Sequence, residues 1–289
     1  MLIVAVLAIS AAAVLVRLAP EVPSVSASLW RTGLVGLLLA PSLLPRAARA
    51  PLDLRGWALG LGAGLLLALH FWAWIESLHR TTVLRSTLLV CLTPIWTGLF
   101  EWTLLRQPPQ RATWVGLGIA LPGVLLMNAG GADPGGVVTP LGDALALVGG
   151  ALSAAYLFVG RVLRPRMALA PYGALVFLSC ALWLLPIAAL SGAPLVGWSP
   201  GAWAALLAMA LGPQLLGHLG LNYAVRYLPA VIVSALILVE PVGAVALSAA
   251  LLGEVPSLLE VIGGAVVLAG VAWAAWPRTT PRREGDAGA

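Results

Sequence analysis

The sequence has little charge and no lysine. Of its 289 residues, 9% are charged, and every basic residue is an arginine. A soluble domain carries about 25% charged residues, so this chain cannot cover a surface in water. The absence of lysine also excludes a P-loop, because that nucleotide-binding loop needs a lysine for the phosphates. The sequence therefore lacks the nucleotide-binding segment that an ATP-driven pump needs.

Cysteine is scarce as well. Cys91 and Cys180 lie inside apolar segments far apart in the sequence, where cysteine usually fills a core. We therefore expect neither a disulfide nor a metal pair from them. The sequence also contains no HExxH motif and no close group of metal ligands. We predict that the protein is not an enzyme and uses no cofactor or metal.

Long apolar runs are what the sequence has in abundance. Hydrophobic residues make up 61% of the chain, and about 20 in a row span a bilayer as a helix. The runs are continuous, unlike the alternating strands of a membrane barrel. They predict an all-α polytopic membrane protein with ten transmembrane helices surrounded by lipid bilayer. The predicted spans are residues 2–18, 24–45, 54–78, 82–104, 112–129, 140–162, 170–190, 200–224, 229–251 and 257–276.

The arginines predict how the spans are oriented. With a cytoplasmic N-terminus, most of the 16 arginines fall in cytoplasmic links, as the positive-inside rule requires. The net charge of +5 therefore reports topology, and we expect no nucleic acid partner. Both termini are predicted to lie in the cytoplasm, with the chain in the cell inner (plasma) membrane.

The two halves of the sequence, residues 1–135 and 136–277, resemble each other at a shift of 147 residues. Each holds five predicted helices, and an odd number makes two copies cross the membrane in opposite senses. Such inverted repeats place a solute site between the halves near the midplane. The alternative is chance overlap, since Gly and Pro are frequent in membrane helices. The coinciding pairs are Pro94 with Pro241, Gly116 with Gly263, Gly123 with Gly270, and Gln107 with Glu254.

Three segments carry a resemblance to a known family. They are LRSTLLVCLTPIWTGLFEWTLLRQ, LGDALALVGGALSAAYLFVGRVL and SALILVEPVGAVALSAALLGEVPSLLEVIGGAVVLAGV. With them, the chain resembles the drug/metabolite transporter (DMT) superfamily, EamA-like branch, over nearly its whole length. The resemblance implies two inverted five-helix repeats around a central cavity, and export of small metabolites or amino acids. Arg106 and Gln107 depart from the family's usual Gly-Glu, which puts a carboxylate role at that place in doubt.

Glu240 is the strongest candidate for coupling transport to protons. It lies near the middle of the ninth predicted span, beside Pro241, which removes a backbone donor and opens the helix. A charged group at that depth costs about 2.5–3.5 kcal/mol on insertion scales, so it is a functional candidate. Its repeat mate is Thr93; the alternative is a Glu that only holds helices together. Pro94 and Pro241 are predicted to have structural or gating roles.

Polar residues follow one face of the eighth predicted span. Gln214, His218 and Asn222 are spaced i, i+4, i+8 and share a face of an α-helix. Interhelical hydrogen bonds in membranes average only about 0.6 kcal/mol, so a cavity wall is favoured over structural bonding alone. Thr93, by the repeat, and Tyr156, by analogy with the family's fold, are further cavity candidates.

His70 mirrors His218, because each precedes its repeat proline by nearly the same distance in sequence. His70, Trp74 and Ser77 share one face of the third predicted span. An imidazole, an indole and a hydroxyl there suit a polar or zwitterionic solute. The alternative is that His70 donates a hydrogen bond to a carbonyl of a neighbouring helix.

Glu76 and Arg31 are predicted to have structural or gating roles. Glu76 lies near the outer end of the third span, where pairing with Arg80 or Arg85 is favoured over contact with solute. Arg31 matches an arginine common in the family. Snorkelling to lipid phosphate or a structural salt bridge are its alternatives.

Together these features predict a secondary transporter that exports a small organic solute by alternating access, with proton coupling as a hypothesis. The open alternatives are a channel or a membrane assembly scaffold and, with less support, an intramembrane enzyme. We predict a monomer or homodimer whose partner is a small-molecule solute, and a polar tail at residues 278–289.

Overall fold

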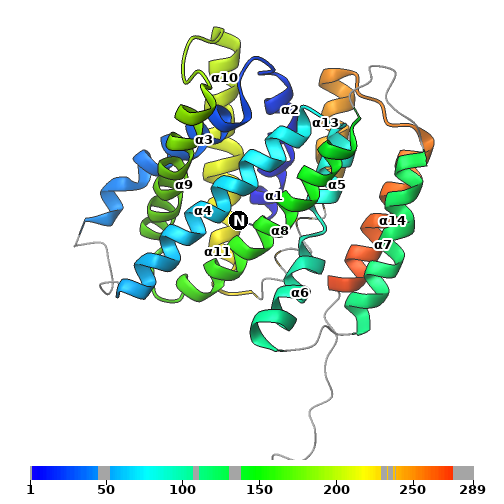
Figure 1. Cartoon of the computed structure of the whole chain (residues 1–289), viewed down its shortest axis with the longest axis horizontal. Helices are drawn as coiled ribbons and strands as arrows, with labels where there is room; N and C mark the ends of the chain where they lie inside the picture. The colour runs from blue at the N-terminus through cyan, green and yellow to red at the C-terminus, as the bar shows by residue number, and fades with distance from the viewer. Residues whose placement is uncertain are drawn as a thin grey trace, which may run out of the picture.

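The structure is a computed structural model that describes residues 2–44, 53–106, 111–129, 138–228, 233, 237 and 239–275. The regular elements in those ranges are all helical, which confirms the predicted all-α class (Figure 1). The first half contains α1 (Leu2–Ser10), α2 (Ala12–Arg17), α3 (Ser24–Leu39), the 3-10 helix η1 (Ala40–Leu43), α4 (Leu54–Leu78), α5 (Val83–Val90), α6 (Thr93–Leu105) and α7 (Arg111–Ala129). The second half contains α8 (Pro140–Leu163), α9 (Leu169–Ser191), α10 (Pro200–Met209), the π-helix η2 (Ala210–His218), α11 (Leu219–Ala224), α13 (Glu240–Leu252) and α14 (Leu258–Ala275).

Several helices begin where the sequence provides a cap. α4 follows Asp53, whose side chain accepts a hydrogen bond from the Gly56 N–H, and α8 follows Thr139, which caps Gly142 in the same way. Both helices agree with their predicted spans to within one residue. Five segments of the described chain are long and apolar enough to cross a membrane: Leu54–Leu78, Val83–Phe100, Pro140–Leu163, Leu169–Ser191 and Pro200–Ala224.

Prolines interrupt helices within the predicted spans. Pro94 has no backbone N–H, and a proline ring clashes with the carbonyl four residues earlier. α5 accordingly ends at Val90, and α6 begins at Thr93. The freed Val90 carbonyl accepts a hydrogen bond of 2.8 Å from the Thr93 hydroxyl. Pro213 has the same effect at Met209, where α10 gives way to η2.

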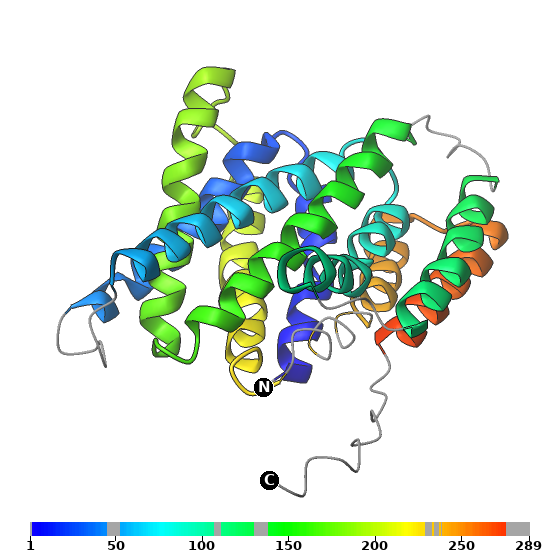
Figure 2. The ribbon, with the colours of Figure 1, turned by 60° about the horizontal axis from the view of Figure 1, so that its bottom comes forward.

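The helices form one bundle with a peripheral pair. α4 packs against α8 and α9, and α3 packs against α9. α7 and α14 pack along each other and lie at one side of the bundle in both views (Figure 1 and Figure 2). Glycines bring their backbones together: a Cβ on Gly123 would lie 2.7 Å from the Gly263 carbonyl oxygen, and one on Gly270 would lie 2.6 Å from that of Gly116.

Replacing Gly123 by alanine is expected to destabilise the protein by about 1–3 kcal/mol, the usual cost of overpacking. Its Cβ would meet the backbone of α14, which cannot move aside as a side chain can. Gly118 lies on the same helix with nothing within 4 Å of a Cβ, so Gly118→Ala is the matched control. Thermal unfolding in one detergent measures the difference, and equal unfolding temperatures would contradict the close contact.

Candidate functional site

A small cavity is lined by polar and apolar residues from both halves of the chain. Its volume is about 30 Å³, and aliphatic and aromatic side chains such as Phe71 and Leu221 form much of the wall. The polar lining residues are Arg31, His70, Trp74, Thr93, Ser153, His218 and Glu240. Five of the residues predicted to bind solute or to couple transport therefore meet at one site.

His70 satisfies both of the roles that its sequence position left open. Its ring lines the cavity, while Nδ1 lies 2.8 Å from the Gly149 carbonyl oxygen. A carbonyl oxygen only accepts, so this contact assigns the hydrogen to Nδ1 and leaves Nε2 of the neutral ring as an acceptor. The rings of His70 and His218 are neighbours, with centroids 6.2 Å apart.

Arg31 is buried inside the bundle with only 1% of its surface exposed. Its Nε donates to Gln214 Oε1 at 3.1 Å, and its guanidinium lies 4.0 Å from the centre of the Phe71 ring, within the range of a cation–π contact. The two alternatives from the sequence, snorkelling to lipid phosphate and a structural salt bridge, are both wrong. Arg31 is buried away from the outer surface, and it forms no ion pair within 4 Å among the described residues. α3 packs against α4, α9 and η2, so this face of the helix points inward.

Gln214, Asn222 and Tyr156 lie behind the cavity wall and not in it. Gln214 Oε1 accepts the hydrogen bond from Arg31 Nε, and the Tyr156 hydroxyl donates to Asn222 Oδ1 at 2.7 Å. Residues 210–218 form a π-helix, and Gln214 and Asn222 each have a hydrogen-bond partner inside the bundle. His218 alone of the predicted polar face lines the cavity.

Ser77 and Glu76 also have structural partners. The Ser77 hydroxyl donates to the Trp74 carbonyl at 2.6 Å and lies 2.6 Å from Ser86 Oγ, so it is not part of the cavity wall. Glu76 accepts a hydrogen bond of 2.8 Å from Arg80 Nε and one of 2.5 Å from Ser24 Oγ. Of the two predicted partners of Glu76, the structure selects Arg80.

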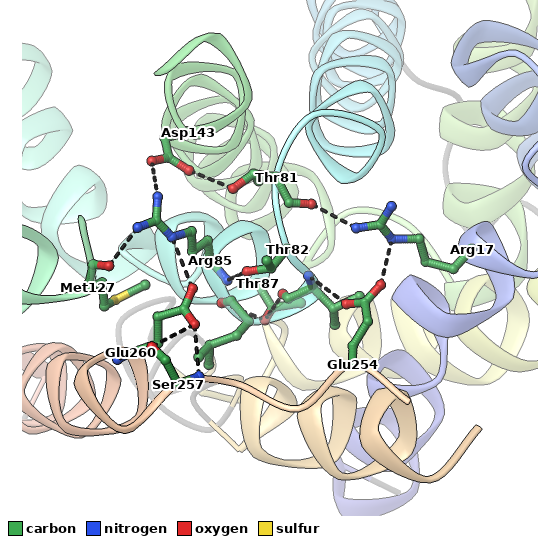
Figure 3. A network of polar contacts seen from close by, with 12 residues as sticks. Arg17, Thr81, Thr82, Arg85, Thr87, Met127, Asp143, Glu254, Ser257 and Glu260 are labelled. Atoms are coloured by element: carbon green, nitrogen blue, oxygen red, sulfur yellow. Dashed lines mark hydrogen bonds and ion pairs between the residues drawn. The ribbon is translucent and has the colours of Figure 1, made fainter. Parts of the chain in front are cut away.

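A second polar cluster joins the ends of several helices (Figure 3). Its ion pairs connect Arg85 with Asp143 and Glu260, and Arg17 with Glu254. We call these five residues the end network. Acidic residues near helix ends are only a weak sequence signal for this network, because sequence spacing does not tell which arginine each acidic residue contacts.

One short sequence pattern has a structural explanation. The segment GWSPG (197–201) matches the GxSxG pattern of serine hydrolases, in which the serine sits on a turn between a strand and a helix. Here Ser199 is the N-cap of α10 and accepts a hydrogen bond from the Ala202 N–H at 3.2 Å. No strand precedes it in the part of the chain that the structure describes.

Interrupted apolar helices around a polar cavity are typical of membrane transporters. Comparison with known proteins agrees: the model of the EamA-like transporter family matches residues 1–129 and 140–276. The chain belongs to the EamA-like transporter family, within the DMT superfamily, and is a multi-pass membrane protein whose partner is a small-molecule solute.

Two individual proteins illustrate the relationship. An uncharacterized transporter of Archaeoglobus fulgidus is 26% identical over 212 residues, which cover 73% of this chain and 71% of the relative. A solved crystal structure superimposes with a TM-score of 0.68 at 20% identity and covers 94% of each chain. The superposition on the solved structure establishes a shared fold.

Replacing Tyr156 by phenylalanine is expected to destabilise the protein by about 0.6–1.7 kcal/mol, from the average to the maximum measured for hydrogen bonds inside membranes. The change removes the donor to Asn222 and leaves that buried amide oxygen without its partner. Tyr223→Phe is the control, because that side chain is 39% exposed. Chemical or thermal unfolding in detergent measures both, and a Tyr156 effect no larger than the Tyr223 effect would refute the assignment.

Proposed function

We propose that this transporter works by alternating access between two inverted five-helix repeats, residues 1–135 and 136–277, with ten membrane spans. Both termini, including the tail at 278–289, lie in the cytoplasm, and transport is export across the inner membrane. The family match supports the division, because it covers two segments of similar length on either side of it.

The contact between α7 and α14 supports the inverted arrangement. At a shift of 147 residues, Gly116 corresponds to Gly263 and Gly123 to Gly270. The two close contacts join Gly123 with Gly263 and Gly116 with Gly270, so exchanging the halves exchanges the contacts. The earlier glycine of α7 contacts the later glycine of α14, and the later contacts the earlier. The two helices are therefore antiparallel, as a two-fold axis in the membrane plane requires.

The unpaired hydrogen-bonding nitrogens of the cavity carry the proposal for the solute. Arg31 Nη1 and Trp74 Nε1, both donors, and His218 Nδ1, whose role depends on the tautomer, are buried without a hydrogen-bond partner among the described residues, and all three side chains line the cavity. Arginine and tryptophan nitrogens only donate, and a buried donor left unpaired costs about 1–3 kcal/mol. A carboxylate satisfies several such donors at once.

Glu240 supplies the opposite charge in the same cavity, and His70 Nε2 supplies a neutral acceptor. An amino group suits these acceptors as a carboxylate suits Arg31. The proposed solute is therefore a small zwitterion such as an amino acid. Its amino group and a proton compete for the Glu240 carboxyl, because a buried carboxylate needs a counter-charge or a proton. That competition couples export of the solute to entry of a proton.

Proton coupling through Glu240 is tested by efflux from proteoliposomes with and without a pH gradient. The solute is chosen by a ligand-induced thermal-shift screen of amino acids and related metabolites. Wild type is expected to respond to the gradient, and Glu240→Gln is expected to lose the response because an amide does not exchange protons. Asp53→Asn, which replaces a carboxylate by another good helix cap, is the control.

Two results of that assay would count against the proposal. Equal gradient responses in wild type and Glu240→Gln would remove Glu240 from coupling. No response in either protein would indicate a uniporter.

The role of Arg31 is tested by comparing binding of an amino acid with binding of its amide, which lacks the carboxylate. Wild type is expected to prefer the amino acid by about tenfold or more, since a hydrogen bond to a charged group contributes about 1.5–3 kcal/mol. Arg31→Gln is expected to lose this preference. Gln214→Leu, which removes the partner of Arg31 Nε, is expected to weaken it. An unchanged preference in Arg31→Gln would reject the carboxylate site.

A further inference from the structure

We infer that the end network is the gate that closes one side of the transporter, held by opposite charges on the two halves. The inference rests on the proposed alternating access. The network lies where α2, α4, α7 and α13 end and where α5, α8 and α14 begin (Figure 3). Links between successive spans on one side of the membrane meet there.

Arg85 is the centre of the gate. Its Nη1 lies 3.3 Å from Asp143 Oδ2, and its Nε lies 3.3 Å from Glu260 Oε1. Nη2 donates to the Met127 carbonyl at 2.6 Å. Its side chain is 3% exposed, so these pairs are shielded from the water and salt that weaken surface ion pairs. One side chain thus ties together the ends of α5, α7, α8 and α14.

Arg17 forms the second tie. Its Nε lies 3.2 Å from Glu254 Oε1, as an ion pair without an aligned hydrogen bond, and its Nη2 donates to the Thr81 carbonyl at 2.8 Å. Glu254 Oε2 in turn accepts from the Val83 N–H at 3.3 Å. The link between α13 and α14 is therefore held against α2 and the link between α4 and α5.

The charges of the network divide between the halves. Both arginines belong to residues 1–135, and all three carboxylates belong to residues 136–277. Every one of its ion pairs therefore crosses from one half to the other. If the halves separate at this end, these pairs must break. By contrast, the Arg80–Glu76 pair lies within α4 and stays intact when the halves move apart.

Another contact between the halves connects α10 with the link that follows α2. Glu21 Oε1 accepts a hydrogen bond of 2.7 Å from the Ser199 N–H, which lowers the pKa of Glu21. Glu21 belongs to the first half and Ser199 to the second. This hydrogen bond would also break if the two halves separated at this end.

The equivalent arginine at the opposite end forms no ion pair with any residue that the structure describes. Arg164 follows Arg17 by 147 residues, but it donates to the carbonyls of Asn222 and Met167, both within its own half. In the sequence, the residues at that shift from Arg85, Glu254 and Glu260 are Ile232, Gln107 and Thr113, all uncharged. In the described part of the chain, ion pairs between the halves therefore occur at the network end, and they favour the conformation closed at that end.

The test uses a cysteine reporter in the cavity. Ser153→Cys is introduced with Cys91→Ala and Cys180→Ala, and a membrane-impermeant maleimide is added from either side, to intact cells and to inverted vesicles. Glu254→Gln and Glu260→Gln each remove one carboxylate charge at nearly constant shape. Each is expected to raise labelling from the network side on the order of tenfold, with a fall from the other side, because the population shifts between two states.

Two control proteins accompany these variants. Arg80→Gln removes a charge at the same end without crossing the halves and is expected to leave both labelling rates unchanged. The exchange Arg17→Glu with Glu254→Arg reverses the pair and is expected to restore the rates only in part, because the new side chains cannot replace the hydrogen bonds to the Thr81 carbonyl and from the Val83 N–H. Thermal unfolding checks that each variant is folded, and Glu254→Gln decides the result alone if Glu260→Gln does not fold.

The outcomes separate the gate from the proposed function. Labelling of wild type from one side, unchanged in the folded glutamine variants, would overturn the gate and leave alternating access standing. An equal rise in Arg80→Gln would overturn it too, since the effect would then be one of surface charge. Equal labelling of wild type from both sides would overturn the gate, because the state closed at the network end would then have no excess population.

Discussion

Inside a bilayer every backbone donor and acceptor needs a hydrogen-bond partner within the protein. At the centre of this structure, prolines leave backbone carbonyls without their helical partners, and other groups of the protein must bind them. Pro94 frees the Val90 carbonyl, which accepts from the Thr93 hydroxyl. In the other half, the carbonyl of Ile237, four residues before Pro241, accepts a weak hydrogen bond of 3.9 Å from the Cys91 thiol. α6 and α13 therefore begin at Thr93 and Glu240, and both of these residues line the cavity. The helix interruptions and the candidate site are one feature.

The charges in the cavity and those in the end network differ in how well they are paired. In the end network each arginine has a carboxylate partner, and each carboxylate has an arginine. In the cavity, Arg31 is held by Gln214 and Phe71 but keeps one nitrogen without a partner in the described chain. Removing one partner of a buried pair is costly, whereas a complete pair is close to neutral. Paired charges suit a contact between halves, and unpaired donors suit a site that receives a ligand.

The sequence predicted local features well and faces of helices unevenly. The bounds of α4 and α8 and the pairing of Glu76 with Arg80 follow from short-range rules of capping and spacing. Of the predicted face of Gln214, His218 and Asn222, only His218 lines the cavity, because Gln214 is bonded to Arg31 and Asn222 to Tyr156. Ser77 is outside the cavity for a similar reason. It lies on the predicted face, but its hydroxyl is taken by the Trp74 carbonyl and by Ser86.

The sequence by itself determined the solvent, the class and the family of this protein. Composition and run length depend only on the cost of exposing apolar groups to water or charged groups to lipid, and the family motifs are contiguous. Only the tertiary structure decided which charges meet. Arg31 reaches Gln214 across 183 residues, and Arg85 reaches Glu260 across 175. Such contacts depend on how helices pack against each other, and no local spacing encodes the distance between two side chains on different helices.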